Sequence, residues 1–235
     1  MKQLLFLSFF LVAVLQSSAQ QHRRVAIMDS LDSDGYAVKV LKWKYKGSWS
    51  WPLTIPGSVV KHYRSKPRLQ WEGDFDYFAK YVEPNDKAAQ TIAESLERVI
   101  ANYKKIYHWT YEDEIMFVVA MIQQMKYEND DDGGYEKYPA ETIFDGAGDC
   151  EDKAILAASL LKRLGYDVSL LFLENEDKTD QHIALGVALD PSRKGTFFEE
   201  SDQAYYYVET TSAGWGIGEI PKKWQGAAAI VIEVR

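Results

Sequence analysis

The 235-residue sequence contains a single cysteine, Cys150. One cysteine excludes an internal disulfide and any zinc site that needs several thiolates. Basic residues are also in deficit, with 27 Lys and Arg against 35 Asp and Glu, which gives a formal net charge of −8. Because the phosphate backbone binds basic surfaces, this balance argues against a nucleic acid as the partner.

Long apolar runs are missing beyond the N-terminus, so no membrane span is expected in the rest of the chain. The N-terminus itself has a basic residue, Lys2, then an apolar run at 4–15 and small residues at 17–19. This order is typical of a secretory signal peptide. The alternative interpretation is an N-terminal membrane anchor that is not cleaved. We expect residues 1–19 to be removed and the protein to be extracytoplasmic, either periplasmic or secreted.

Hydrophobic residues make up 46% of the chain and charged residues 26%, so the chain has enough apolar sequence to bury a core. Residues 20–84 are rich in Trp, Tyr and Lys, and the stretch 38–46 nearly alternates apolar and basic residues, as a half-buried strand does. We therefore expect a β-rich N-terminal extension at 20–84 and the main domain at 85–235.

Helical patterns dominate the first half of that main domain. Apolar residues recur every three or four positions from Ala88 to Tyr103. Thr110 followed by Asp113 suggests a capping box at the start of a second helix. A third helix is expected from about Cys150 to Leu164, where the following glycine favours a left-handed helix end.

Strand-like runs follow the helices, at 166–173, 182–189, 205–210 and 228–234. Helices first and consecutive strands afterwards indicate an α+β fold with an antiparallel sheet. No glycine-rich phosphate-binding fingerprint is present, which argues against a doubly wound nucleotide-binding fold.

Cys150 stands at the start of the third helix, directly after Asp149, a good N-cap. A helix N-terminus lowers the pKa of a thiol and so favours the nucleophilic thiolate. The carboxylates of Asp149, Glu151 and Asp152 work against this effect, so a positive partner is required. The alternative is that Cys150 is a small buried apolar residue.

His182 and Glu209 are the candidate partners of Cys150. His182 opens one strand, and Glu209 ends an apolar and aromatic one, where a carboxylate is unusual unless it has a partner. Together the three residues supply a nucleophile, a base and a group that orients the base. The alternatives are a structural histidine and a Glu209 that pairs with a surface lysine.

At this point the sequence resembles a known family. The motif Gly148-Asp149-Cys150-Glu151-Asp152 resembles the transglutaminase-like superfamily, which has a papain-like fold, and is most similar to the bacterial transglutaminase-like cysteine proteinases. The resemblance covers about residues 85–220 and does not explain the first 80. Its further segments are Ala154, 164–166, 121–127, 138–142, 182–185 and 207–211.

The resemblance implies a papain-like, transglutaminase-like core in which a central helix bearing Cys150 packs on an antiparallel sheet that carries His182 and Glu209. Two departures stand out. Ile183 and Ala184 follow the histidine where transglutaminases usually have a tryptophan, and the third triad member is Glu instead of Asp. The first departure weakens a cross-linking function, and the second bears on triad geometry.

The reaction implied by the resemblance is acyl transfer at an amide of a protein or peptide substrate. Cys150 attacks the carbonyl to form a thioester, and His182 protonates the leaving amine. Oxyanion donors would be the backbone N–H of Cys150 and the side chain of Gln123 or Gln124, between which the sequence does not choose. Hydrolysis of a peptide or amide bond is our first hypothesis; the alternatives are a protein-glutamine amine transferase and a catalytically silent binding module.

No cofactor is required by this chemistry, and calcium is an optional ligand. In the resembling proteinases, acids at the positions of Asp149 and Glu151 bind calcium. The acidic stretch 130–136 offers further oxygen ligands, although it lacks the alternating spacing of an EF-hand loop. The competing interpretations are a helix cap for Asp149 and a solvated turn for the acidic stretch.

Overall fold

The computed structural model describes residues 30–31, 35–129, 135–175 and 178–234. The expected signal peptide at 1–19 and the acidic stretch at 130–134 lie outside these residues. Within the described part of the chain, no helix combines the length and apolar character needed to cross a membrane.

The chain begins with a three-stranded antiparallel sheet in the order β1-β2-β3, formed by β1 (Ser30–Leu31), β2 (Tyr36–Lys44) and β3 (Ser48–Pro56). Burial alternates along β3, because successive side chains of a strand point to opposite faces. The strand expected at 38–46 is confirmed as part of β2.

Four helices follow: α1 (Gly57–Ser65), α2 (Asp76–Ala79), α3 (Lys87–Tyr107) and α4 (Tyr111–Gln123). The side chain of Asp86 caps α3 by accepting the N–H groups of Ala88 and Ala89. The capping box expected at the start of α4 is present, since Thr110 and Asp113 each accept the other's backbone N–H.

The segment that leads to the cysteine contains β4 (Lys126–Tyr127), α5 (Pro139–Asp145) and β5 (Ala147–Gly148), and β4 pairs in parallel with β5. Helix α6 (Cys150–Arg163) starts immediately afterwards, capped by Asp149, which accepts the backbone N–H of Asp152 at 3.2 Å. Its residues from Asp152 to Leu161 are buried, so α6 runs through the core.

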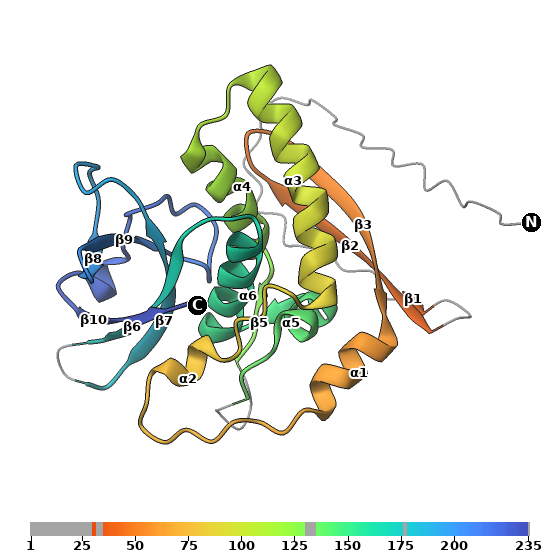
Figure 1. The fold of residues 1–235 in the computed structure, drawn as a ribbon, viewed down its shortest axis with the longest axis horizontal. Coiled ribbons are helices and arrows are strands. Elements are labelled where there is room, and N and C mark those ends of the chain that lie inside the picture. Colours follow the sequence, from red (N-terminus) through yellow and green to blue (C-terminus); the bar gives the residue numbers. More distant parts are fainter. Residues whose placement is uncertain (1–29, 32–34, 130–134, 176–177, 235) are drawn as a thin grey trace, which may run out of the picture.

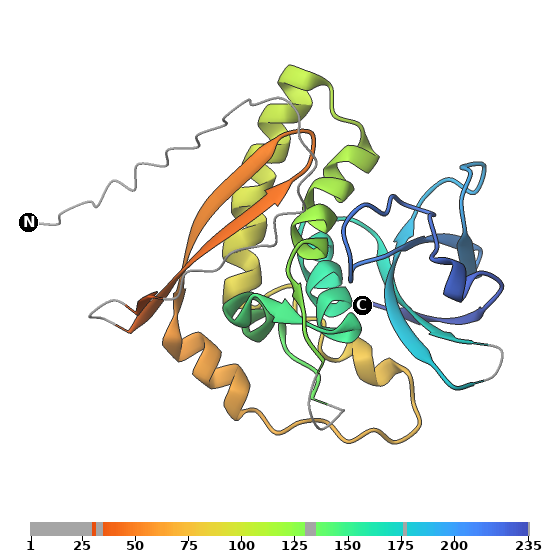
Figure 2. The same ribbon diagram turned by 180° about the vertical axis from the view of Figure 1, so that it is seen from behind.

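The second half of the chain forms an antiparallel sheet in the order β10-β6-β7-β9-β8. Its strands are β6 (Val168–Glu174), β7 (Gln181–Ala188), β8 (Phe197–Glu200), β9 (Gln203–Val208) and β10 (Ala228–Glu233), and a short 3₁₀ helix, η1 (Lys222–Trp224), precedes β10. Figures 1 and 2 show this sheet on one side of α6, with α3 and the N-terminal hairpin on the other. The expected α+β fold, with the cysteine-bearing helix packed on an antiparallel sheet, is confirmed.

The N-terminal hairpin shares the core of the helices. Trp43 and Trp49 pack on Phe117 of α4 with ring centroids 5.3 and 4.8 Å apart. The side-chain amide of Gln124 also pairs with both the backbone N–H and the carbonyl of Lys44, each at 3.0 Å. The hairpin is therefore joined to α4 by both apolar and polar contacts, and the domain boundary at residues 84 and 85 stays a prediction.

Candidate active site

A glycine and a buried ion pair set the start of α6. A Cβ atom on Gly148 would lie 2.6 Å from Cβ of Asp152, so only glycine fits beside the first helical turn. Asp152 in turn accepts the backbone N–H of Lys137 at 2.7 Å and pairs with its Nζ at 3.0 Å. These contacts hold the first turn of α6, and with it Cys150, against the segment before α5.

The thiol of Cys150 is partly buried between several polar groups. Its Sγ donates to Oε2 of Glu151 at 2.9 Å and accepts the backbone N–H of Ile183, the residue after His182. Burial first, and then the charge and hydrogen bond of Glu151, raise the pKa of the thiol far above its usual range. In this state the carboxylates outweigh the helix N-terminus, and the thiol is protonated.

His182, near the start of β7, and Glu209, just after the end of β9, lie together because these two inner strands are antiparallel neighbours. Nε2 of His182 is 3.3 Å from Oε2 of Glu209, and both side chains are buried. This is an ion-pair distance, but the N–H direction does not meet the geometry of a hydrogen bond. The structure thus brings the expected base and its orienting carboxylate into contact, in a looser arrangement than a fully formed triad has.

Glu209 is held by three further donors. The hydroxyl of Tyr207 donates to Oε2 at 2.7 Å, and Thr211 donates its backbone N–H and its hydroxyl to Oε1 at 2.9 and 2.7 Å. Burial alone would raise the pKa of Glu209, but His182 and these donors lower it to about 2. The carboxylate therefore stays ionised at any pH at which the protein would work.

An aromatic ring covers the imidazole. The indole of Trp224 stacks on His182 with the ring centroids 5.3 Å apart and the planes 9° from parallel. Trp224 is itself buried and lies in η1, and its neighbour Lys223 pairs with Asp180, two residues before the histidine. The ring that covers His182 thus comes from a segment far along the chain.

Neither glutamine candidate has a free amide donor in this structure. Nε2 of Gln123 donates to the carbonyls of Glu209 and Trp215 at 2.8 and 3.0 Å. Nε2 of Gln124 donates to the carbonyls of Lys44 and Ala120 at 3.0 and 2.8 Å. An oxyanion role for either glutamine stays a prediction, and it would require these bonds to open.

The two candidate calcium ligands already have partners. Asp149 caps α6, and Glu151 accepts the thiol of Cys150. The described residues contain no group of three or more His, Cys, Asp or Glu side chains arranged to hold a metal ion. The chemistry of the pair suits a hard cation, since two carboxylates flank one thiol, but these residues supply only part of the six to eight oxygen ligands that calcium takes.

Lys153 is a buried residue of the site that the sequence reasoning missed. Its Nζ donates to the carbonyls of Met125 and Thr211 at 2.8 and 3.0 Å, and so joins α6 to the segments after α4 and after Glu209. Burial lowers the pKa of Lys153 to about 8, although the charge of Glu209 opposes the shift. A lysine within the apolar run of α6 was the signal that could have identified it.

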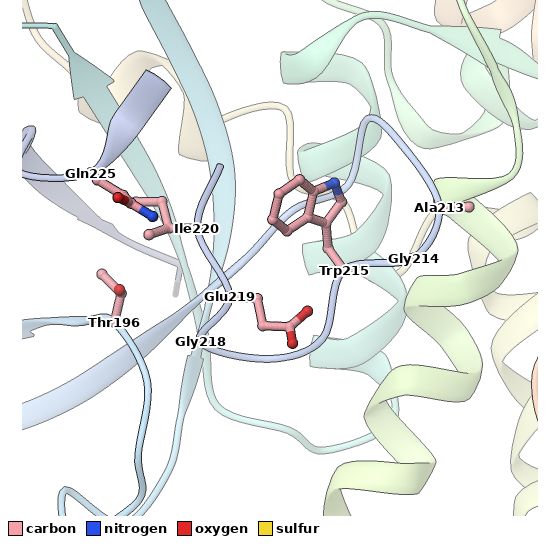
Figure 3. A pocket seen from close by; sticks show the side chains of 8 residues that line it. All are labelled: Thr196, Ala213, Gly214, Trp215, Gly218, Glu219, Ile220 and Gln225. Atoms are coloured by element: carbon pink, nitrogen blue, oxygen red, sulfur yellow. The ribbon is translucent and has the colours of Figure 1, made fainter. Parts of the chain in front are cut away.

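The segment that joins Glu209 to Trp224 borders an open cleft of about 540 Å³. Figure 3 shows Trp215 and Glu219 projecting from this segment, with Ile220, Gln225 and Thr196 on the opposite side. The position of Trp215 depends on the core, because its carbonyl accepts the buried Gln123 amide.

The described residues form an α+β fold in which a thiol, an imidazole and a carboxylate lie near the start of α6. Among solved structures, the chain is similar to LapG of Legionella pneumophila, with 18% identity over 68% of this chain and 73% of that one and a TM-score of 0.40. A calcium-bound LapG structure is 19% identical over 72% of this chain and 94% of that one, with a TM-score of 0.30.

Two further solved structures are of the kinds that the sequence motif resembles. A cysteine protease candidate from Cytophaga hutchinsonii is 13% identical over 89% of this chain and 74% of that one, with a TM-score of 0.40. A TGase is 10% identical over 80% of this chain and 48% of that one, with a TM-score of 0.38. No protein-family model and no curated protein matches the sequence.

Proposed function

We propose that the chain is an exported cysteine hydrolase that cleaves a peptide or amide bond through Cys150, His182 and Glu209. The observation that carries this proposal is the meeting of two segments at the start of α6. Sγ of Cys150 contacts the backbone of the residue after His182, and Nε2 of that histidine faces an ionised, buried Glu209. These contacts support the assignment of a nucleophile, a base and an orienting carboxylate to the three residues.

Acylation follows from the orientation of the imidazole. With Nε2 turned towards Glu209, Nδ1 is the nitrogen left to take the thiol proton of Cys150. Sγ attacks the substrate carbonyl, and the carbonyl π electrons move onto oxygen. When the tetrahedral adduct collapses, the C–N bond breaks and His182 passes its proton to the leaving amine, which leaves a thioester on Cys150.

Deacylation restores the enzyme. A water molecule gives a proton to His182 and attacks the thioester, the C–S bond breaks, and the thiolate regains the proton as the acid product leaves. An amine in place of water would give a new amide, which is the transferase alternative. Hydrolysis is favoured by the absence of a tryptophan directly after His182, the departure from the transglutaminase pattern.

The protonated resting thiol needs a step before attack. The bond from Sγ to Glu151 must break so that the thiol proton can move to His182. Calcium at Asp149 and Glu151 would supply positive charge that favours the thiolate. We propose this site as an accessory to the reaction, in keeping with the calcium-bound form of LapG among the similar structures.

The hydrolase proposal is tested with a peptide library made from denatured cellular protein. The library is incubated with the wild-type chain, with Cys150→Ala and with His182→Ala, and new peptide ends are counted by mass spectrometry. New ends that appear only with the wild type support the hydrolase. Equal sets of ends from the wild type and Cys150→Ala contradict it.

Parallel reactions with a fluorescent primary amine separate hydrolysis from amine transfer. Incorporation of the amine into glutamine side chains, dependent on Cys150, would support the transferase. A catalytically silent binding module would show neither reaction, and its thiol would be alkylated by iodoacetamide only after unfolding.

Export and domain organisation belong to the same proposal. Cell fractionation and N-terminal sequencing of the mature protein test cleavage after residue 19. A mature chain that begins at residue 20 in an extracytoplasmic fraction supports export, and a chain that begins at Met1 in the cytoplasm contradicts it. The segment 20–84 would be retained, because its strands β2 and β3 pack on α4.

A further inference from the structure

A tyrosine outside the expected triad reaches the thiol. Tyr127 lies in β4, directly opposite Gly148 of β5 in the parallel pair. The pairing is extended by the next residue, since the backbone N–H of Glu128 donates to the carbonyl of Gly148 at 3.1 Å. Two backbone contacts therefore place the Tyr127 ring beside the residues that lead into Cys150.

The phenol of Tyr127 has one end at the nucleophile and the remainder towards solvent. Its hydroxyl lies beside Sγ of Cys150, while 46% of the residue's surface is exposed. Most buried polar groups near the site serve the fold, whereas a half-exposed side chain that reaches the thiol can also reach a bound substrate. A carbonyl bound at the Cys150 thiol would therefore lie close to the Tyr127 hydroxyl.

Several other side-chain donors near the site already have acceptors. The hydroxyls of Tyr207 and Thr211 donate to Glu209, and three more groups donate to backbone carbonyls. The amides of Gln123 and Gln124 each donate to two carbonyls, and so does the ammonium group of Lys153. Breaking such bonds in a partly buried region costs free energy, about 0.5–1.5 kcal/mol for each. The Tyr127 hydroxyl can turn to a new acceptor at lower cost, because its neighbour is the reacting sulfur and not a backbone carbonyl.

We propose that Tyr127 is a catalytic residue that donates a hydrogen bond from its hydroxyl to the oxyanion formed when Cys150 attacks the substrate carbonyl. This assignment rests on the proposed function. In the tetrahedral adduct the oxyanion is two bonds away from Sγ, so a hydroxyl in contact with Sγ reaches that oxygen by a small rotation. The second donor is the backbone N–H of Cys150, which lies in the first helical turn and has no intrahelical acceptor.

The chemical state of Tyr127 suits this role. Burial, followed by the charges of Cys150, Asp149 and Glu151, raises the pKa of the phenol well above its usual range. The hydroxyl therefore keeps its proton over the whole pH range in which a cysteine hydrolase works. It remains a donor when negative charge develops on the substrate oxygen.

Tyr127→Phe tests the assignment, because it removes the hydroxyl and keeps the ring. The matched control is Tyr135→Phe, another partly exposed tyrosine, whose hydroxyl donates to Glu141 at 2.8 Å. Two reactions of Cys150 are compared: acylation by p-nitrophenyl acetate, which forms an oxyanion, and alkylation by iodoacetamide, which forms none. A peptide aldehyde, which adds to the thiol to form an oxyanion, gives a third measurement.

Loss of one oxyanion donor typically lowers the rate by roughly 10²–10³-fold. We expect Tyr127→Phe to slow acylation by a factor in this range and to weaken the aldehyde, while alkylation stays within about twofold of the wild type. Tyr135→Phe should change none of the three.

Other results overturn the assignment. If the tyrosine only covers the thiol, both acylation and alkylation become faster in Tyr127→Phe; if it only supports the fold, both fall together. An acylation rate equal to that of the wild type also overturns it. A wild type that is never acylated overturns the proposed function and the assignment together, whereas a wild type that is acylated no faster than Tyr127→Phe overturns the assignment alone.

Discussion

Replacing Glu151 with glutamine should lower the pKa of the Cys150 thiol. In the wild type, Oε2 of Glu151 accepts the thiol at 2.9 Å, and its charge opposes the thiolate. Glutamine has the same shape and still offers an oxygen to the thiol, but it carries no charge. The change therefore tests the electrostatics of the site with little change in packing.

The size of the decrease in the thiol pKa follows from two interactions that Glu151→Gln removes. A hydrogen bond to a charged group contributes about 1.5–3 kcal/mol and a neutral one about 0.5–1.5, so the amide loses about 1 kcal/mol of preference for the protonated thiol. Repulsion between the carboxylate and the thiolate is screened because Cys150 is only partly buried, and we take about 0.5–1 kcal/mol for it. At about 1.36 kcal/mol for each factor of ten, the thiolate fraction at neutral pH should rise by about tenfold to thirtyfold.

The reaction with iodoacetamide, followed as a function of pH, measures this change. A thiolate of lower pKa is also a weaker nucleophile, with a Brønsted coefficient of about 0.4–0.5, so the alkylation rate at neutral pH should rise by about threefold to eightfold. Measurements with excess EGTA keep calcium out of the comparison. The control is Glu128→Gln, because Glu128 is half-exposed and pairs with Lys126 at 2.6 Å.

Two results would refute this reasoning. A thiol pKa in Glu151→Gln that is equal to that of the wild type, or higher, would mean that burial alone controls the thiol. An equal decrease in Glu128→Gln would mean that net charge, and not the contact with Glu151, controls it.

Four further predictions concern stability and calcium. The pKa of Glu209 is lowered to about 2, so this carboxylate stabilises the fold at any pH above its ordinary pKa of about 4.3. About 3 kcal/mol of the free energy of unfolding should be lost as the pH falls from about 4.3 towards 2. Urea unfolding of Glu209→Gln should lack this loss. The pKa of Lys153 is lowered to about 8, so the unfolded chain binds more protons than the folded one between pH 8 and about 10.4. The free energy of unfolding should therefore rise by about 3 kcal/mol as the pH increases across that range in the wild type, but not in Lys153→Met. Calorimetric titration should detect calcium binding that weakens at least about tenfold in Asp149→Asn, a change that keeps a good N-cap; equal affinity in the variant would remove Asp149 from the site. Trp49→Ala should cost about 3–5 kcal/mol in urea unfolding, since the indole is buried against Phe117, and a cost below about 1 kcal/mol would show that the N-terminal hairpin folds independently of α4.

Local features of the fold could be predicted because consecutive residues carry them. The capping box at Thr110 and the cap at Asp149 depend on side chains three residues from their partners, so they are visible in the sequence. The strand periods of the second half give an antiparallel sheet, because consecutive strands pair most easily that way. The order of its strands did not follow in this way: β10 pairs with β6 at the far edge, which depends on the path of the chain after β9.

The candidate triad was also accessible from the sequence. Cys150, His182 and Glu209 are each unusual in their surroundings, and the distance between the latter two agrees with the pairing that the sequence suggested. The protonation of the thiol was not accessible. It depends on how far the Glu151 side chain turns towards Sγ and on how much solvent the fold removes from it.

Other residues of the site act through contacts between distant segments, and composition does not reveal such contacts. Trp224 stacks on His182 although a long stretch of chain separates them, and Lys153 joins carbonyls of two other segments. Gly148 is required because a Cβ there would clash with Asp152. Each of these contacts depends on how the fold brings distant segments of the backbone together.

By itself, the sequence predicted which residues could carry chemistry, and it placed Cys150 at a helix start and His182 on a strand, because caps and periodicity act over a few residues. Only the tertiary structure decided the electrostatic balance at Cys150 and the partners of its base. Coulomb and hydrogen-bond energies depend on distances of a few ångströms and on the water that packing excludes, and both arise only when segments far apart in the chain come together.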